Sequence, residues 1–341
     1  MLPVTLEKLM KKEHLDRETA REAMGMIMDG KATPAQIGAF LAALRMKGEQ
    51  VEEVIGFAQA MRERALQLPL PGEGLIDTCG TGGDGSNTFN ISTAAAIVAA
   101  SGGARIAKHG NRAVSSKSGS ADVLEALGIP IMMSPETAVS CLMETNLCFL
   151  FAPLYHQAMK HAAAPRKELA VRTVFNLLGP LTNPARAKRQ LMGIYDASLL
   201  TVVAEALREL NVERALIVAG EDGLDELTIT GKSWIAELKD GEIRSYEINP
   251  EELGLERRSI DEIRGGDAAY NAAIIEDVFS GKRGAARDIV LFNAGAILYL
   301  ADQAASIGHG VIRAAELIDS GEVMKKLRQI REIAGGLMDA S

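Results

Sequence analysis

The chain has 341 residues, of which 47% are hydrophobic and 24% charged, and its formal net charge is −8. This length and composition predict a sizeable core and leave room for two domains. The negative charge and the 4% aromatic content argue against a broad nucleic-acid surface, and the apolar runs are too short or too interrupted by charge to span a bilayer. With no leader-like start either, we expect a cytoplasmic protein that binds neither nucleic acid nor membrane.

The first 66 residues predict four short helices, separated by glycines at Gly30 and Gly48. Apolar residues between Ala39 and Met46 are denser than one thin helical layer can cover, so we expect this segment to pack on the main domain or on a second copy of the chain. We predict an N-terminal helical domain over residues 1–70, with residues 67–74 as its linker. The expected helices begin at Thr5, run from Asp16 to Met28, open at Thr33-Pro34, and run from Val51 to about Leu66.

A glycine-rich loop, residues 80–88, follows the expected strand 75–79 and precedes an alanine-rich helix. Glycines let backbone N–H groups approach an anion closely, and the first turn of the next helix adds about half a positive charge. Asn90, Ser92 or Thr93 can cap that helix. The spacing matches neither the dinucleotide fingerprint nor the P-loop. Taken alone, the loop is as consistent with tight packing as with phosphate binding.

A second loop, residues 108–120, lies about 30 residues further on in what we predict to be one βαβ unit. It contains Lys108, Arg112 and Lys117, several hydroxyls and two glycines, with no acidic residue before Asp122. Solvated basic loops are usually rich in Glu and poor in glycine. This composition therefore predicts an anion site, and the two loops together predict a site for phosphate groups.

From residue 75 onward, short apolar strands alternate with helices, which predicts a mainly parallel sheet flanked by helices over residues 71–341. Residues 156–184 are helical and then turn-rich, and the part near 165–185 is expected to complete the helical domain. The chain after Asp267 is expected to be mostly helical. Further strands are expected at 129–132, 147–152, 191–195 and 215–219, helices at 121–127, from Ser134-Pro135 and at 199–210, and a hairpin at 235–238 and 243–248.

An acidic turn follows the strand that ends at Ala219, with four carboxylates in the six residues from Glu221 to Glu226. Loops at the carboxyl ends of sheet strands face the ligand crevice. Oxygen ligands of this kind suit Mg²⁺ that is held jointly with substrate phosphates. A solvated turn is the alternative. The two anion loops favour the Mg²⁺ site, because clustered phosphates and carboxylates need a cation between them.

The three cysteines, Cys79, Cys141 and Cys148, form no C-x-x-C pair and lie in apolar surroundings. We therefore expect neither a disulfide framework nor a zinc site. Cys79 directly precedes the glycine-rich loop and could be proposed as a nucleophile, but a small apolar strand residue explains it more simply. Of the five histidines, only His109 lies in a candidate site.

The sequence resembles the anthranilate phosphoribosyltransferase family over nearly its full length, including the helical domain. The one departure, Gln157 where the family usually has proline, bears only on the local chain path. The resemblance implies a nucleoside phosphorylase-like fold, Mg²⁺ as cofactor and a homodimer joined through the helical domain. It rests on Gly80-Thr81-Gly82-Gly83-Asp84, Asn90-Ile91-Ser92-Thr93, Lys108-His109-Gly110-Asn111-Arg112, Arg166, Asn183-Pro184 and Asp225-Glu226.

The implied reaction transfers the phosphoribosyl group of 5-phosphoribosyl 1-diphosphate to the amine of anthranilate, with release of diphosphate, as the second step from chorismate to tryptophan. The family likeness implies that Ser92, Asp225 and Glu226 bind the metal, and that Asn111 and Arg166 face anthranilate. No strong general base is expected, because an arylamine is already neutral at pH 7. The implied substrate-binding residues are Gly80, Thr81, Gly82, Gly83, Asp84, Thr88, Asn90, Ile91, Ser92, Thr93, Lys108, His109, Gly110, Asn111, Arg112, Ser115, Ser116, Ser120 and Arg166.

Two alternatives remain open at this point. A pyrimidine nucleoside phosphorylase would share the fold and the phosphate loops but would carry a different second loop. A non-catalytic relative that binds single-stranded nucleic acid would need a basic groove, against the acidic balance of this chain.

Overall fold

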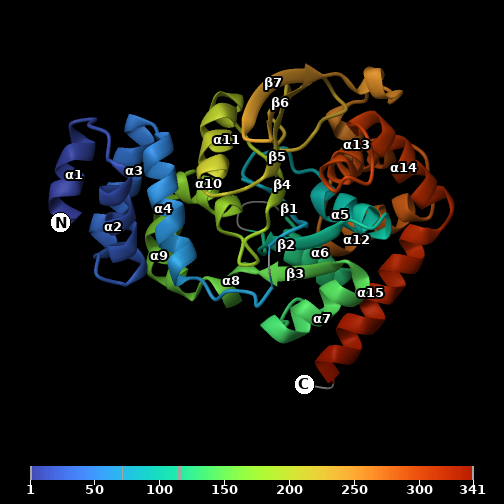
Figure 1. Ribbon diagram of the computed structural model, residues 1–341, viewed down its shortest axis with the longest axis horizontal. Helices are drawn as coiled ribbons and strands as arrows, with labels where there is room; N and C mark the ends of the chain where they lie inside the picture. Colours follow the sequence, from blue (N-terminus) through green and yellow to red (C-terminus); the bar gives the residue numbers. More distant parts are fainter. Residues whose placement is uncertain (1, 71, 114–116, 340–341) are drawn as a thin grey trace.

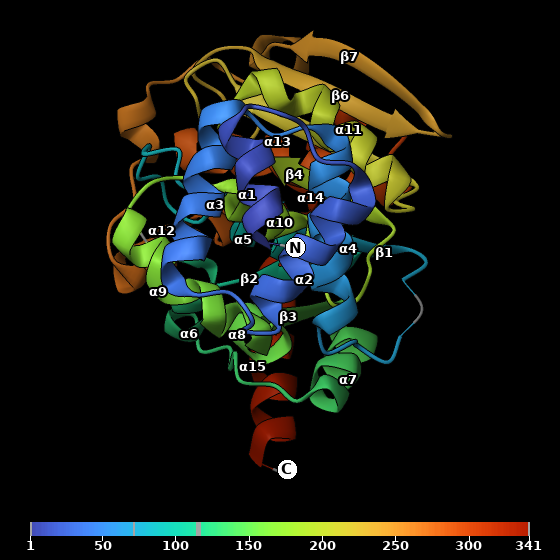
Figure 2. The same ribbon diagram turned by 90° about the vertical axis from the view of Figure 1, so that its left-hand side faces the viewer.

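The computed structural model describes residues 2–70, 72–113 and 117–339. An N-terminal group of helices lies beside an α/β region that is built on one seven-stranded sheet (Figure 1). Viewed from the N-terminal side, these helices lie in front of the sheet (Figure 2). Within the described ranges, no helix is long and apolar enough to cross a membrane.

The four N-terminal helices are present as predicted, but the first begins at Leu2 and not at Thr5, and local capping sets the starts of the second and third. Asp16 accepts a hydrogen bond of 2.8 Å from the Thr19 N–H at the start of the second helix. Thr33 and Gln36 form a reciprocal capping box before Pro34. The bounds are α1 Leu2–Met10, α2 Arg17–Met28, α3 Pro34–Lys47 and α4 Val51–Arg64.

The chain returns to these helices after the third strand, through α8 (Ala152–Tyr155), η1 (Gln157–Met159), α9 (Lys160–Leu169) and α10 (Val174–Leu178). The buried Phe175 and Leu178 share one apolar core with α2, α3 and α4. The short η2 (Pro180–Thr182) then leads back toward the sheet.

The sheet has the strand order β3-β2-β1-β4-β5-β6-β7 and is mostly parallel, as predicted. Neighbouring strands from β3 to β5 run parallel, while β5, β6 and β7 pair antiparallel. The expected hairpin is therefore present as β6 and β7. The bounds are β1 Leu75–Gly80, β2 Arg105–Gly110, β3 Leu147–Phe151, β4 Arg189–Gly193, β5 Arg214–Gly220, β6 Ser233–Lys239 and β7 Glu242–Ile248.

Both faces of the sheet are covered, and β5 shows how its side chains divide between them. Leu216 and Val218 enter the core beneath α5, α13 and α14, whereas Ile217 and Ala219 enter the core shared with α11 and the N-terminal helices. This is the period of two expected of a strand buried on both faces. The covering helices are α5 Ile91–Ser101, α6 Ser120–Ala126, α7 Pro135–Thr145, α11 Leu200–Glu209, α12 Ala268–Phe279, α13 Ala285–Leu300, α14 Ile307–Asp319 and α15 Glu322–Asp339.

The short connections are the helical turns η3 Ala197–Leu199, η4 Pro250–Leu253 and η5 Ile260–Ile263. The strand expected at 129–132 is wrong, because these residues are irregular. Ile129 and Ile131 are buried while Met132 is 52% exposed, so the alternation is real. No neighbouring strand pairs with this segment in the described chain, and buried alternation without a pairing partner makes no strand.

The strand order places a topological switch point at β1. After β1 the chain builds β2 and β3 on one side, and then crosses to build β4 and β5 on the other. In open α/β sheets, ligands bind outside the carboxyl ends of the strands at such a point. We therefore expect a ligand to bind among the loops that follow the ends of these strands, at Gly80, Gly110, Gly193 and Gly220.

Candidate active site

The glycine-rich loop folds across the carboxyl ends of β1 and β4. The Thr81 N–H donates to the Gly193 carbonyl at 3.0 Å, and the Thr81 hydroxyl accepts from the Tyr195 N–H at 3.2 Å. Gly82 and Gly83 have φ of 64° and 71°, a left-handed conformation that favours glycine. Within the described residues the Gly83 N–H has no hydrogen-bond partner. The loop therefore presents an unused backbone donor to the crevice.

The acidic turn divides into two pairs with different roles. Asp222 accepts hydrogen bonds from the Thr228 hydroxyl (2.8 Å) and the Thr230 hydroxyl (2.6 Å), which holds the turn together. Asp225 instead accepts from the Gly82 N–H at 2.7 Å. Glu226 accepts from the Ser92 N–H at 3.2 Å, in the first turn of α5. The second pair thus links the turn after β5 to the predicted phosphate loop and to the first turn of α5 that follows it.

The environment of Asp225 and Glu226 fits a bound divalent cation. Desolvation, followed by the nearby Asp84 carboxylate, raises the pKa of Asp225 well above its usual value. Desolvation also raises the pKa of Glu226 to about 7. Neither carboxylate forms an ion pair within the described residues. Clustered carboxylates without a cation are costly, so the donor set suits Mg²⁺.

No group of three His, Cys, Asp or Glu side chains with metal-binding geometry occurs among the described residues. Two carboxylates, Asp225 and Glu226, and the Ser92 hydroxyl cannot complete an octahedral shell on their own. Mg²⁺ usually keeps waters and takes the remaining ligands from substrate phosphates. The residues present fit that incomplete kind of site.

Lys108 is a buried cation at the centre of the site rather than a loop residue. The structure places Lys108, His109 and Gly110 inside β2, so the predicted loop start at 108 is wrong by three residues. Lys108 is 3% exposed, and its ammonium donates to the Thr78 carbonyl and, at 3.3 Å, to the Ser92 hydroxyl. Burial lowers the pKa of Lys108 from its usual value. These three residues stay in the strand because they pair with Phe149, Leu150 and Phe151 of β3.

His109 lies against a second histidine, His156, which the sequence analysis left outside the candidate site. The rings of His109 and His156 lie 5.0 Å apart, centroid to centroid. Burial lowers the pKa of His109 to about 3 and that of His156 to about 4, so both rings are neutral at pH 7. The Nε2 atoms of both have no hydrogen-bond partner in the structure. Two neutral, buried rings thus lie beside each other, one in β2 and one directly after α8.

Residues 90–93 contribute in different ways. Asn90 occupies the N-cap of α5 without a side-chain cap bond, and its amide instead donates to the Ser118 carbonyl at 3.2 Å. Asn271 donates to the Asn90 side-chain oxygen at 3.0 Å, which holds that amide in place. Ile91 is 1% exposed and lies in the core, so only its backbone can face a ligand. The Thr93 hydroxyl is buried and unpartnered.

The second loop is only partly described, because Ser115 and Ser116 lie outside the described residues. Its Arg112 is paired with Glu125 at 2.6 Å and with Asp122 at 2.9 Å, so its charge is already balanced. The Ser120 hydroxyl donates to the Asn111 carbonyl at 3.2 Å. The roles of Arg112, Asn111 and Ser120 in binding stay predictions. Thr88 pairs with Arg264 in an isolated antiparallel β-bridge.

Arg166 lies in α9, the helix that returns to the N-terminal bundle. Proline is favoured in the first turn of a helix, and Pro165 before Arg166 would predict a helix start there, but α9 begins at Lys160 and Pro165 lies inside it. The guanidinium of Arg166 lies 4.9 Å from the centroid of the Phe175 ring. Burial lowers the pKa of Arg166 from its usual value, and no carboxylate pairs with it within the described ranges. A half-buried cation on an aromatic face, without an anion, is suited to bind a ligand carboxylate.

Two residues of the site were not identified from the sequence. Arg172 donates to the Gly83 carbonyl at 3.2 Å and lies 4.3 Å from the centroid of the Tyr195 ring. Asn176 donates to the Thr81 carbonyl at 3.4 Å. Both belong to the segment that returns the chain between the two core regions. Its turn-rich composition was the only available signal, and it does not say which loop the segment meets.

Comparison with known proteins places this geometry in a class. The model of a glycosyl transferase family, a/b domain, matches residues 72–324, and that of the helical bundle domain of a glycosyl transferase family matches residues 4–65. Together these two models define a two-part glycosyl transferase.

Individual relatives identify the family within this class. Anthranilate phosphoribosyltransferase from Brevibacillus brevis is 72% identical over 341 residues and covers 100% of both chains. The crystal structure of the enzyme of that name from Thermus thermophilus has a TM-score of 0.91 at 42% identity, covering 96% of this chain and 98% of that one. The Saccharomyces cerevisiae enzyme in complex with PRPP and Mg has a TM-score of 0.90 at 28% identity, covering 98% of each chain. The chain belongs to the anthranilate phosphoribosyltransferase family.

Proposed function

We propose that this protein transfers the phosphoribosyl group of 5-phosphoribosyl 1-diphosphate to anthranilate, giving N-(5-phosphoribosyl)anthranilate and diphosphate in tryptophan biosynthesis. One observation carries the proposal: Asp225 and Glu226 bond to the phosphate loop and to the first turn of α5, through Gly82 and Ser92. A diphosphate cradled there lies against the carboxylates that suit Mg²⁺. The family membership supplies the acceptor.

The chemistry needs charge stabilisation more than proton transfer. The ribose C1–O bond breaks, the anthranilate nitrogen forms the new bond to C1, and the nitrogen then loses a proton to water or diphosphate. Asp225, Glu226 and Ser92 would hold Mg²⁺, which would supply positive charge against the departing diphosphate. The unused Gly83 N–H and the amino end of α5 face the same charge, and the buried Lys108 adds a fixed positive charge beside Ser92. These groups are already in place before the substrate binds.

Arg166 supplies the acceptor side of the proposal. One bidentate guanidinium contact to a carboxylate contributes about 1.5–3 kcal/mol, or roughly 10- to 150-fold in affinity. Arg166→Ala should therefore raise the KM for anthranilate by about that factor and leave the KM for phosphoribosyl diphosphate nearly unchanged. The loss of anthranilate fluorescence, followed with and without phosphoribosyl diphosphate and Mg²⁺, measures both constants. If phosphoribosyl diphosphate binding is lost instead, Arg166 belongs to the phosphate side.

We also propose a domain boundary at residues 70 and 71, with residues near 165–185 completing the helical domain. The shared core of α2, α3, α4 and α10 supports this division. A homodimer through the helical domain is supported by the exposed Val4 (60%), Met10 (66%) and Met46 (79%) on α1 and α3. Val4→Asp with Met46→Asp should shift the mass measured by light scattering from dimer to monomer. A cytoplasmic location is supported by three unpaired cysteines.

A further inference from the structure

A cavity of about 650 Å³ lies at the opposite end of the sheet from the candidate active site. Its walls come from the end of α4, the following linker, the segment 184–188 before β4, and the residues that follow α11. The Lys188 N–H donates to the Gly72 carbonyl at 3.2 Å, so the linker and the segment 184–188 are joined at its floor. The cavity thus touches two places where the chain passes between the helical and α/β regions.

Three cations line this cavity, and none of them forms an ion pair within the described part of the chain. Arg62 is partly buried, Lys188 is partly buried and Arg186 is exposed. Their hydrogen-bond acceptors are all neutral. These acceptors are the carbonyls of Leu181 (2.7 Å) and Leu210 (3.1 Å) for Arg62, the Gln67 amide oxygen (2.8 Å) for Arg186, and the Asn211 carbonyl (2.9 Å) for Lys188.

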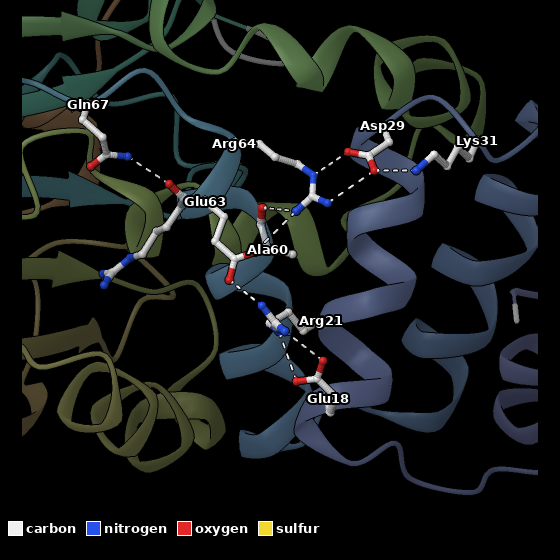
Figure 3. A network of polar contacts seen from close by, with 9 residues as sticks. Glu18, Arg21, Asp29, Lys31, Ala60, Glu63, Arg64 and Gln67 are labelled. Carbon is white, nitrogen blue, oxygen red and sulfur yellow. Dashed lines mark hydrogen bonds and ion pairs between the residues drawn. The ribbon is translucent and has the colours of Figure 1, made fainter.

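The one acidic residue in the lining, Glu63, is already neutralised by other groups. Its carboxylate pairs with Arg21 at 2.7 Å and with Arg64 at 3.6 Å. Figure 3 shows this carboxylate directed toward Arg21 and Arg64 and away from Gln67. The positive charge in the cavity is therefore not balanced from its own walls.

The arrangement of these cations is costly without an anion. Burial and then the nearby Arg186 lower the pKa of Arg62 to about 10, so two guanidinium groups repel each other beside a desolvated space. Arg186 also has a φ of 48°, which is uncommon for a residue with a side chain. Strained backbone of this kind persists where surrounding structure holds it, often at ligand sites.

The remaining wall is apolar. Leu68, Ala185, Ala187 and Leu210 are buried and face the same space, with Leu70 at the edge. Several converging donors beside an apolar wall are typical of sites for small organic ligands. We propose that this cavity is a second ligand site, which binds a small organic anion with its phosphate or carboxylate group between Arg62, Arg186 and Lys188.

The ligand does not compete with substrate, because Gly72 and Lys188 precede the amino ends of β1 and β4 while the substrate loops follow their carboxyl ends. A ligand bound in the cavity would connect α4 to the segment 184–188. These two segments lie where the chain passes between the helical and α/β regions.

Phenyl phosphate and benzoate are the probes that test the site, by calorimetric titration. The titration uses the enzyme without diphosphate or anthranilate, since both are anions of the kind that the cavity is proposed to bind, and the cavity variants described below separate this site from the active site. One equivalent of at least one probe should bind to the wild-type enzyme. Binding of phenyl phosphate alone assigns the site to phosphate esters, and binding of benzoate alone assigns it to carboxylates. No binding of either probe up to about 10 mM, a very weak affinity, overturns the proposal.

The matched variants are Arg186→Gln in the cavity and Arg328→Gln on α15, where the exposed arginine has no ion pair in the described chain. Losing a charge-assisted hydrogen bond should weaken probe binding about tenfold or more in the first variant and not at all in the second. Equal affinities in both variants overturn the proposal. Lys188→Gln is a second cavity variant with the same expectation. Unchanged unfolding midpoints without ligand show that the cavity variants are folded.

Discussion

Replacing Asp225 by Asn tests whether the acidic turn holds Mg²⁺. The amide keeps the size of the side chain and can still accept from the Gly82 N–H, now 2.7 Å from the carboxylate. It removes one charge from the pair formed with Glu226. A contact that depends on an ionised group contributes about 1.5–3 kcal/mol. The Mg²⁺ concentration at half-maximal rate should therefore rise roughly 10- to 150-fold.

The stability of the same variant should move in the opposite direction. Desolvation and the neighbouring carboxylates raise the pKa of Asp225, so the charged form is disfavoured in the folded protein without metal. Asp225→Asn should thus not lower, and is expected to raise, the free energy of unfolding measured in urea with a chelator present. A structural residue that bound no metal would show the reverse.

Asp222→Asn in the same turn is the matched control. Asp222 accepts from two threonine hydroxyls and from the Leu224 N–H at 3.1 Å, and none of these bonds involves the phosphate loop. Its replacement should lower the unfolding free energy by about 1–3 kcal/mol and leave the Mg²⁺ titration unchanged. Rates measured against free Mg²⁺ at saturating substrates decide the question. An unchanged titration for Asp225→Asn, or equal shifts in both variants, refutes the assignment.

Three further outcomes are expected. Gly83→Ala, at a φ of 71° that costs an L residue about 1–2 kcal/mol, should raise the KM for phosphoribosyl diphosphate while circular dichroism stays unchanged. Burial lowers the pKa of His156 from 6.5 to about 4 and that of His109 to about 3, so the unfolded chain binds the extra protons and each ring should contribute about 2 kcal/mol to a loss of stability between pH 7 and pH 5. Urea unfolding should show about half of this histidine contribution absent in His156→Gln and all of it retained in His309→Gln, which replaces an exposed ring. Glu53→Ala should lower the free energy of unfolding in urea by about 3–5 kcal/mol, since it leaves the buried Lys47, now 2.8 Å away, without its partner; a loss below about 1 kcal/mol would contradict this.

Features set by neighbours along the chain could be predicted from the sequence. The caps at Asp16 and Thr33 and the hairpin across Asp240-Gly241 depend on residues only a few positions apart. The strand predicted at 129–132 was wrong because strand formation depends on residues far away along the chain. Its alternation is correct for burial, but strand formation needs a neighbour elsewhere in the chain, and local pattern carries no information about that neighbour.

It was harder to predict from the sequence which basic side chains are free to bind a ligand than to predict where the glycine-rich loop lies. Arg112 looked free in the sequence because the nearest acidic residue was ten positions away. The helix α6 brings both Asp122 and Glu125 back onto it. Lys108, by contrast, is held more firmly in place than a loop residue would be. Strand pairing buries it, and its ammonium donates to the Ser92 hydroxyl. Sequence composition thus did not show which cations stay free for a ligand.

Gly193 shows why the proposed metal-binding turn could be suspected but its position could not be predicted from the sequence. A Cβ at Gly193, where β4 ends, would overlap the Asp225 carbonyl, and one at Gly80 would overlap the Asp225 carboxylate. The turn after β5 therefore passes over the end of β4 to reach the loop after β1. Two glycines more than 30 residues away along the chain make room for one aspartate. Their role is steric, so Gly193→Ala should displace Asp225 from Gly82 and impair Mg²⁺ dependence even though Gly193 itself holds no metal.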